Sequence, residues 1–352
     1  MKNSSLIVNL SVLSKRPTGI SVYAKNLISE MSSLEPKLFS AENIGFGLSS
    51  DAGWKGHARR LWWVQSYLRN YYHSTGASLI FSPLPEAPLF SKCRYIVTVH
   101  DIIPLRFPQY FSSHLLAYFR YYVRQVVTQA QHIVCDSVST AQDLTDFYNV
   151  PASKITPILL AYNHLHFKPY SGDTKKYFLY LGRPDPHKNL SRLIQAFQRV
   201  SQKNPSLELW IVGPTDKRYT PSLAAQAESM GVSEKIRFLN YIDYDQLPQL
   251  IGCAIALVFP SLWEGFGLPP LEAMACGTPV ITSNLASLPE VVGDAAILID
   301  PYNSDDLANA MGMLANDSKL RNTLRIAGLE RVQQFSWRKT GQQTVEVLKK
   351  FL

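Results

Sequence analysis

Residues 259–281 read FPSLWEGFGLPPLEAMACGTPVI and hold the most informative pattern in this chain. The stretch opens at the end of an apolar run that predicts a buried strand. Gly265 and Gly267 follow, and glycine lets a backbone approach a ligand closely with its N–H groups turned outward. Pro269 and Pro270 then predict a helix start, because proline fits the first helical turn. The pattern therefore indicates a strand, a ligand-binding turn and a helix.

Two glutamates, Glu264 and Glu272, are separated by seven residues across this turn. A helix N-terminus here would attract a diphosphate through its N–H groups and its dipole. Glu272 falls on the first turns of the predicted helix, where its carboxylate could accept two hydrogen bonds from a ribose. Glu264 precedes the turn and would face hydroxyls of a transferred group. The alternative is an ordinary helix whose acidic residues only favour its N-terminus.

A second cluster, GRPDPHKN at residues 182–189, follows a predicted strand and precedes a predicted helix. Fixed cations at such a place stabilise the charge that a diphosphate leaving group gains as its bond breaks. Arg183 would bind a phosphate through two N–H groups, and Lys188 would act as a point charge. We expect both at a diphosphate, and the alternative is a pair of surface charges on a loop.

The rest of the chain alternates apolar strand, turn and amphipathic helix, which predicts βαβ units and buried parallel sheets. In the first half we expect strands at 6–13, 78–82 and 95–99, and helices at 20–31, 115–129 and 138–148. Residues 151–172 contain three prolines and predict a linker. In the second half we expect a helix at 190–200 and strands at 177–181, 207–212, 236–239, 254–259, 279–282 and 296–299.

A chain of 352 residues is long for one apolar core, so two domains are expected. We predict an α/β fold with two doubly wound, Rossmann-like domains, at residues 1–165 and 166–335. Residues 336–352 predict a C-terminal helix that crosses back to the first domain, with Ser336 as its N-cap.

Two positions in the first half fall where strands of a parallel sheet end. Gly19 follows Pro17-Thr18 and opens a predicted helix, where it could admit a phosphate or an acceptor, or serve helix packing. His100 closes a buried strand, and Asp101 beside it could orient the imidazole. For a lone histidine at a strand end, a structural role is the alternative.

Residues 259–281 resemble the signature of retaining glycosyltransferases of family 4, which carries a Glu-x7-Glu motif. The likeness continues through Ser283-Asn284 and residues 288–296 to Asp300-Pro301, and it covers most of residues 177–337. It implies the GT-B fold, in which two Rossmann-like domains face a central cleft.

The resemblance also implies roles for single residues. In this family the Gly-Phe-Gly backbone holds the sugar and the diphosphate, a role that falls on Phe266, Gly267 and Leu268. The second glutamate, Glu272, holds the ribose, and the first, Glu264, contacts hexose hydroxyls.

Further roles follow for the residues outside this stretch. Arg183 and Lys188 match the cation pair that the family places at the diphosphate, and His100 matches a histidine near the transferred sugar. Residues 240–243 are expected to border the nucleobase. The family often has two glycines where this chain has only Gly19, which leaves the contact of Gly19 open.

The reaction implied is transfer of a hexose, with retention, from a nucleotide-diphosphate sugar to a saccharide or lipid-linked saccharide in polysaccharide assembly. The pattern is nearest to mannosyltransferases of O-antigen assembly, which favours GDP-mannose over a UDP-hexose as donor. No metal and no bound cofactor are implied. The alternatives are an epimerase or a phosphorylase on the same fold, or an inactive basic binding protein.

The net charge of +8 is concentrated in the first half, where residues 1–170 hold 16 Lys and Arg against 9 Asp and Glu. Such a surface attracts anions, including acidic lipids. Residues 59–69 and 118–124 combine basic and aromatic residues, which suits a bilayer headgroup region or an ordinary core with snorkelling cations. We expect a cytoplasmic protein, peripheral on the inner face of the membrane, and no nucleic-acid partner.

The four cysteines are far apart in the sequence and match neither a zinc site nor a disulfide framework. We expect reduced thiols, in keeping with the cytoplasmic location. The sequence also lacks an apolar run of the length that spans a membrane and the pattern of a signal peptide.

Overall fold

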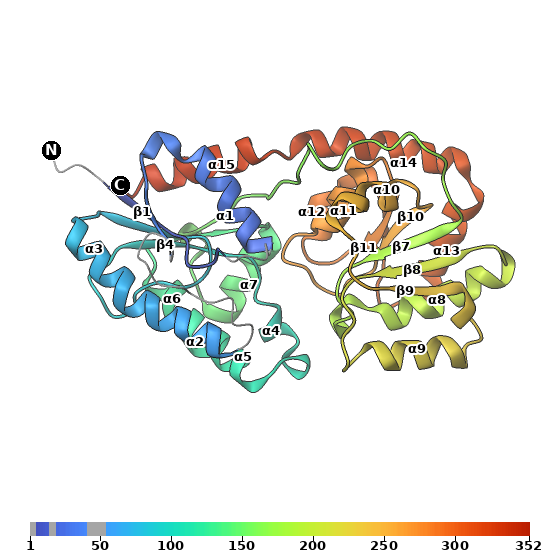
Figure 1. Ribbon diagram of the computed structural model, residues 1–352, viewed down its shortest axis with the longest axis horizontal. Coiled ribbons are helices and arrows are strands. Elements are labelled where there is room, and N and C mark those ends of the chain that lie inside the picture. The colour runs from blue at the N-terminus through green and yellow to red at the C-terminus, as the bar shows by residue number, and fades with distance from the viewer. Residues whose placement is uncertain (1–4, 14–18, 41–53) are drawn as a thin grey trace. The chain divides into compact units, whose positions relative to one another are not determined.

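The computed structural model describes residues 5–13, 19–40 and 54–352, and the chain forms two compact units. Unit 1 comprises Met1–Leu160 together with Ser336–Leu352, and unit 2 comprises Ala161–Phe335. Each unit contains a six-stranded sheet (Figure 1). The predicted α/β class with two doubly wound domains is confirmed. In the described part of the chain, no helix has the length and apolar character needed to span a bilayer.

The sheet of unit 1 has the strand order β2-β1-β3-β4-β5-β6, and every pairing is parallel. Its four inner strands are buried along their whole length, which is the pattern of a parallel sheet covered on both faces. The strands are β1 Leu6–Asn9, β2 Lys37–Phe39, β3 Leu79–Ser82, β4 Tyr95–Val99, β5 His132–Cys135 and β6 Ile155–Pro157.

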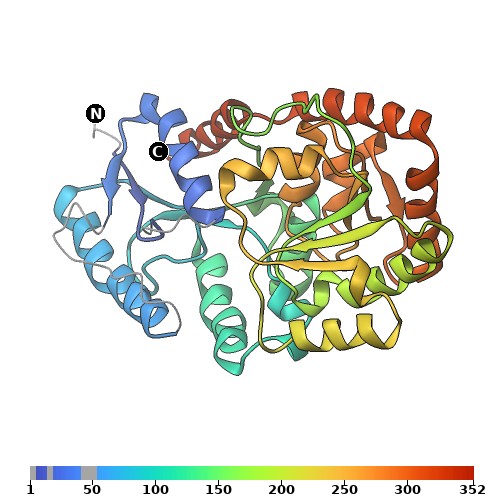
Figure 2. The same ribbon diagram turned by 45° about the vertical axis from the view of Figure 1, so that its right-hand side comes forward.

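Two helices, α1 (Gly19–Glu30) and α15 (Trp337–Lys349), lie side by side on one face of this sheet (Figures 1 and 2). A Cβ added at Gly341 would lie 2.2 Å from the Glu30 side chain, so glycine is needed for this close approach. The C-terminal helix thus completes the core of unit 1. The remaining helices of the unit are α2 Trp54–Trp63, α3 Arg69–Thr75, α4 Ile103–Arg106, α5 Ser113–Ala117, α6 Arg124–Gln129 and α7 Val138–Tyr148.

Several details of unit 1 differ from the expectation. Strands β2 and β5 were not predicted, and β6 forms inside the segment expected to be a linker. The first strand ends at Asn9 rather than at residue 13. The helix expected at 115–129 contains a π-helical segment, η5, at Tyr118–Val123, and a second π segment, η3, joins α2 to α3 at Val64–Leu68.

The sheet of unit 2 has the order β12-β11-β10-β7-β8-β9, again all parallel. The strands are β7 Tyr177–Leu181, β8 Glu208–Val212, β9 Ile236–Leu239, β10 Ala256–Phe259, β11 Val280–Ser283 and β12 Ile297–Ile299. The helices are α8 Leu190–Lys203, α9 Thr220–Ser229, α10 Leu247–Gly252, α11 Leu268–Ala275, α12 Leu288–Val292, α13 Ser304–Asn316 and α14 Ser318–Arg331.

The strand order of unit 2 reverses between β7 and β10, which are neighbours in the sheet but far apart in the sequence. In doubly wound sheets, ligands bind outside the carboxyl ends of the strands at this reversal. The segments that leave β7 and β10 there are residues 182–189 and 260–267. They are the two segments that the sequence predicts to hold a diphosphate.

Candidate active site

The turn that leaves β10 ends at Gly267, the N-cap residue of α11. Its φ of 122° is a conformation that side chains rarely tolerate, and a Cβ there would lie 2.8 Å from Leu288 Cδ2. Pro269 and Pro270 carry no N–H, so the donors of this helix start are concentrated at residues 266–268. The backbone therefore presents a compact set of N–H groups at the positive end of α11.

Ser287, just before α12, holds this turn in place. Its hydroxyl lies 3.0 Å from the carbonyl oxygen of Glu264 and 2.5 Å from that of Phe266. Because Ser287 is fully buried, these contacts fix the turn against the body of the unit. The sequence pattern assigned no role to Ser287, which lies 20 residues beyond the turn in the sequence.

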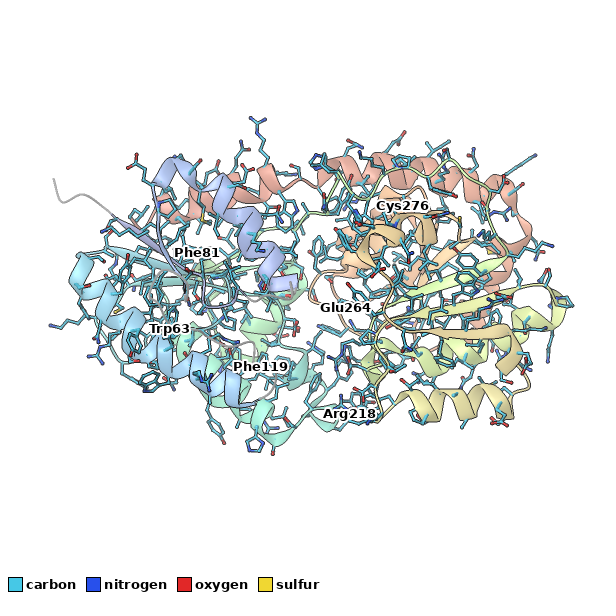
Figure 3. The ribbon with its side chains drawn as sticks, in the orientation of Figure 1. Trp63, Phe81, Phe119, Arg218, Glu264 and Cys276 are labelled. Atoms are coloured by element: carbon cyan, nitrogen blue, oxygen red, sulfur yellow. The ribbon has the colours of Figure 1, made fainter. Side chains whose placement is uncertain are left out.

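The Glu264 and Lys188 side chains meet at the ends of β10 and β7. Lys188 Nζ donates to both carboxylate oxygens of Glu264, at 2.7 and 2.8 Å, and both side chains are largely buried. The same ammonium lies 5.6 Å from the centre of the Phe259 ring. Figure 3 shows Glu264 at this edge of unit 2. The structure therefore joins the two clusters that were identified separately in the sequence.

Asn189 connects the same two segments through its side chain. It has a left-handed backbone (φ 65°), which asparagine tolerates better than most residues. Its amide nitrogen donates to the carbonyls of Pro260 at 3.1 Å and Pro301 at 2.7 Å. The asparagine thus holds the 182–189 turn against the turn after β10, a function that its position in the sequence did not reveal.

Arg183 is more exposed than Lys188 and is held by acidic neighbours. Its Nε lies 3.1 Å from Asp185, and its guanidinium lies 3.7 Å from Asp216 in the turn after β8. Asp216 also binds Arg218 through two hydrogen bonds, which lower the pKa of Asp216 to about 2. Arg218, labelled in Figure 3, adds a cation to this edge that the sequence pattern had not singled out.

Glu272 lies on the second turn of α11. Burial raises the pKa of this carboxyl to about 8. Within the described residues, no Lys, Arg or His forms an ion pair with it. The side chain is half-buried, and a carboxylate shielded from water without a compensating cation is costly. Such groups concentrate at functional sites.

An aromatic pair lies close to Glu272. Tyr244 stacks on His166 with ring centres 3.7 Å apart, and His166 Nε2 lies 2.8 Å from the Tyr244 carbonyl oxygen. Burial raises the pKa of Tyr244, and the charge of Glu272 adds to the rise. The predicted nucleobase segment, residues 240–243, directly precedes Tyr244, and its Tyr241 is exposed.

In unit 1, His100 directly follows β4. Its Nδ1 lies 2.7 Å from the carboxylate of buried Asp136, and its Nε2 lies 3.0 Å from the Pro83 carbonyl oxygen. Burial acts to lower the pKa of His100, but attraction and hydrogen bonding by Asp136 outweigh it and raise the pKa. Because both partners are acceptors, this geometry suits an imidazolium with both nitrogens donating.

The expectation that Asp101 orients the imidazole is wrong, since Asp136 makes that contact. Asp101 instead accepts a hydrogen bond of 3.1 Å from the backbone N–H of Ile103 at the start of α4. Gly19 begins α1, and a Cβ there would meet no atom within 4 Å. The preceding turn, including Pro17-Thr18, lies outside the described residues. Among the described residues, no cluster of three His, Cys, Asp or Glu side chains is arranged to hold a metal ion.

Comparison with known proteins covers both units of the chain. Residues 163–331 match the family model described as glycosyl transferases group 1, and residues 17–163 match that of Glycosyltransferase Family 4. The O-antigen chain mannosyltransferase RfbU of Salmonella typhimurium is 30% identical over 325 residues, which cover 87% of this chain and 90% of that protein. The O-antigen chain mannosyltransferase B of Escherichia coli is 29% identical over 303 residues, which cover 83% and 77%.

Solved structures share the fold over nearly the whole chain. A sucrose-phosphate synthase from Thermosynechococcus elongatus superposes with a TM-score of 0.77 at 18% identity, covering 99% of this chain and 98% of that one. The Anabaena protein HepE, in complex with UDP and glucose, superposes with a TM-score of 0.75 at 19% identity, covering 98% and 100%.

These matches favour glycosyl transfer over the epimerase, phosphorylase and inactive binding protein that the sequence left open. They cover both units of the chain and include relatives matched over most of their own length. The chain belongs to glycosyltransferase family 4 and is a hexosyltransferase with the GT-B fold.

Proposed function

We propose that the protein transfers mannose from GDP-mannose to a saccharide or a lipid-linked saccharide in polysaccharide assembly. The observation that carries the donor site is the half-buried carboxyl of Glu272, which has no ion-pair partner among the described residues and lies on the helix that follows the glycine turn. Mannose is the sugar named for both O-antigen relatives, which supports mannose as the transferred group.

In this proposal the nucleotide lies across the carboxyl ends of β7 and β10. The Glu272 carboxylate accepts hydrogen bonds from the two ribose hydroxyls, which supply the partners that the burial of this group demands. The N–H groups of Phe266, Gly267 and Leu268 bind the diphosphate at the positive end of α11.

Lys188 and Arg183 neutralise the charge that develops on the departing diphosphate. The bond between hexose C1 and the diphosphate oxygen breaks, and a bond from C1 to the acceptor oxygen forms on the same face. The proton of the acceptor hydroxyl passes to the departing phosphate oxygen. Glu264, held by Lys188 before the donor arrives, binds hexose hydroxyls. His100 contacts the transferred sugar, and Gly19 contributes to binding at the start of α1.

The proposal also covers the location of the protein in the cell and its access to the acceptor. We propose that the protein works in the cytoplasm, peripherally on the inner face of the membrane, where a lipid-linked acceptor would be found. The excess of Lys and Arg in residues 1–170 supports this location, because it attracts anionic lipids.

Calorimetric titration of the whole protein with GDP-mannose and with UDP-glucose tests the donor site. We expect GDP-mannose to bind more tightly, and Glu272→Ala to weaken its binding at least tenfold. The control is Glu330→Ala, which removes an exposed carboxylate of α14 and should leave the affinity unchanged. Tighter binding of UDP-glucose would reject the donor assignment, and equal binding by wild type and Glu272→Ala would reject the site.

A further inference from the structure

Unit 2 contains a pocket at the edge of its sheet opposite the candidate donor site. Residues that precede three strands line it: Thr174 before β7, Ala254 and Ile255 before β10, and Gly277 and Pro279 before β11. These are the amino ends of the strands, whereas the donor is proposed to bind at the carboxyl ends of β7 and β10. Strand β7 has five residues and spans about 16 Å, so the pocket is separate from the donor site.

The pocket has a volume of about 240 Å³. A single water needs about 10–15 Å³ of such space, so the pocket has room for a small organic molecule. Helix α14 supplies one wall through Ser318, Arg321, Asn322 and Arg325. These four positions follow the spacing of one helix face, so their side chains point to the same side of α14.

The two arginines keep hydrogen-bond donors available. Arg321 Nη1 donates to the carbonyl oxygens of Leu314 and Ala315 at 2.7 and 3.3 Å, at the C-terminal end of α13. Its other nitrogens, and the whole guanidinium of Arg325, have no acceptor in the described part of the chain. Both residues are half-buried. Support of a helix end therefore accounts for one nitrogen of Arg321 and for none of Arg325.

Glycines let two side chains of the pocket lie directly against the backbone. A Cβ at Gly277 would lie 3.1 Å from Arg325 Nε, and a Cβ at Gly252 would clash with the side chain of Tyr170. The Tyr170 N–H donates to the carbonyl oxygen of Cys276 at 3.0 Å, next to the end of α11 (Figure 3). The pocket therefore has closely packed walls, in which Tyr170 and Arg325 are held in place.

The charge of the pocket has one sign. Its lining residues include two arginines and no Asp or Glu. Asp173 and Asp317 adjoin lining residues in the sequence but do not line the pocket, and the Asp317 carboxylate accepts two backbone N–H groups as the N-cap of α14. Two guanidinium groups without a lining carboxylate favour an anionic ligand.

We propose that this pocket binds a sugar phosphate, with its phosphate at Arg321 and Arg325. A guanidinium matches the geometry of a phosphate and donates to it through two N–H groups. Four uncharged polar side chains line the same pocket and suit the hydroxyl groups of a sugar: Tyr170, Thr174, Ser318 and Asn322. The inference does not rest on the proposed donor site, since none of these residues takes part in it.

Calorimetric titration of the whole protein with mannose 6-phosphate tests the proposal, because the phosphate of this probe is not on C1 as it is in the donor. We expect it to bind at least tenfold more tightly than inorganic phosphate, and mannose alone not to bind. Saturating GDP-mannose should leave the binding in place, since the two sites lie at opposite edges of the sheet.

Arg325→Gln should lower the affinity for mannose 6-phosphate at least tenfold, because a charge-assisted pair of hydrogen bonds is lost. The matched control is Arg199→Gln in α8, which removes the same charge away from the pocket and should stay within twofold of wild type. Thermal unfolding checks that both variants fold.

A second variant keeps the test available if Arg325→Gln fails to fold. Asn322→Asp preserves the size of an exposed side chain and places a negative charge at the pocket, so it should also weaken binding at least tenfold. Asn309→Asp adds the same charge at an exposed position of α13 that does not line the pocket, and should have less than a twofold effect.

Three outcomes overturn the proposal. Displacement of mannose 6-phosphate by GDP-mannose would place it in the donor site. Equal affinity for inorganic phosphate would exclude recognition of the sugar, and equal losses in the pocket and control variants would exclude this pocket. Glu272→Ala should weaken binding of GDP-mannose but not of mannose 6-phosphate, so failure of this inference is distinct from failure of the donor site.

Discussion

At the scale of single residues, Glu272 illustrates how a group proposed to bind the donor can oppose the stability of the fold. Its folded pKa of about 8 lies above the ordinary value of 4.5 because burial disfavours the charged form. The folded state therefore holds a proton that the unfolded chain releases between these values. The contribution of this group to the free energy of unfolding falls as the pH rises from about 4.5 to about 8.

Glu272→Gln is expected to remove this penalty. At pH 9 the variant should be more stable than wild type by roughly 2–4 kcal/mol, and near pH 4 the difference should vanish. Chemical denaturation at both pH values measures it, with Glu330→Gln as the exposed control. A gain of equal size at both pH values would show that the buried charge is not its cause.

His100 and Asp136 form the corresponding pair in unit 1. The raised pKa of His100 means that the pair stabilises the fold below pH 6.5, and that this contribution is lost as the pH rises through the raised value. The other carboxylate oxygen of this residue, Asp136 Oδ1, has no hydrogen-bond partner among the described residues.

Asp136→Asn should lower the pKa of His100 below 6.5, because burial then dominates. An NMR titration of the histidine ring signals measures this pKa. His132, whose pKa is lowered mainly by burial, should not change and serves as the internal reference. An unchanged pKa of His100 in the variant would contradict the role given to Asp136.

At the scale of elements, the start of α11 depends on a glycine. Gly267→Ala is expected to destabilise the protein by about 1–3 kcal/mol, since φ 122° is strained for alanine and the new Cβ meets Leu288. It should also weaken GDP-mannose binding. Gly312→Ala is the control: it lies within α13, its Cβ meets nothing within 4 Å, and it should stabilise by about 0.5–1 kcal/mol. Equal effects of the two changes on unfolding would contradict this account.

The six strands of unit 2 and its helix α8 could be predicted from the sequence, because their apolar runs are clearly bounded by polar residues, glycine or proline. Strand β2 has three residues, and β6 ends in Pro157 within a segment rich in proline, so neither shows a period that can be detected. Their identity as strands comes from pairing with β1 and β5, which is a tertiary effect.

In the candidate site, residues within local motifs could be predicted from the sequence, whereas residues that support them from distant positions could not. Glu264, Lys188 and Glu272 fall in local patterns that carry chemical meaning, so the sequence predicts a role for each, and the structure brings Glu264 and Lys188 into contact. Ser287 and Asp136 act through contacts with residues at least 21 positions away, and no local pattern reveals such partners. The sequence suggested Asp101 as the partner of His100 because the two are adjacent, and adjacency carries no information about partners that are distant in the sequence.

At the scale of the whole molecule, unit 1 is completed by a helix from the far end of the chain. Ser336 caps α15 by accepting from the Lys339 N–H at 3.2 Å, and Thr340 donates to the Leu159 carbonyl at 2.7 Å. Buried Val345 and Leu348 of α15 add to the core. The fold of unit 1 therefore depends on residues that follow unit 2 in the sequence.

Ser336→Ala should lower the free energy of unfolding by about 1 kcal/mol, because the N-cap hydrogen bond of α15 is lost. Because α15 belongs to unit 1, the loss should fall on the unfolding of that unit and leave the transition of unit 2 in place. Calorimetry resolves the two transitions, and GDP-mannose should raise the one that belongs to unit 2. Ser229→Ala, at the exposed end of α9, is the control. A shift of the ligand-sensitive transition by Ser336→Ala would contradict this assignment.

We propose that a nucleotide sugar binds at the carboxyl ends of β7 and β10. A crystal structure of the whole protein with GDP-mannose tests this proposal. We expect both ribose hydroxyls within hydrogen-bond distance of the Glu272 carboxylate, and the diphosphate at the N–H groups of residues 266–268, near Arg183 and Lys188. A nucleotide bound elsewhere, or one whose ribose makes no contact with Glu272, would contradict it.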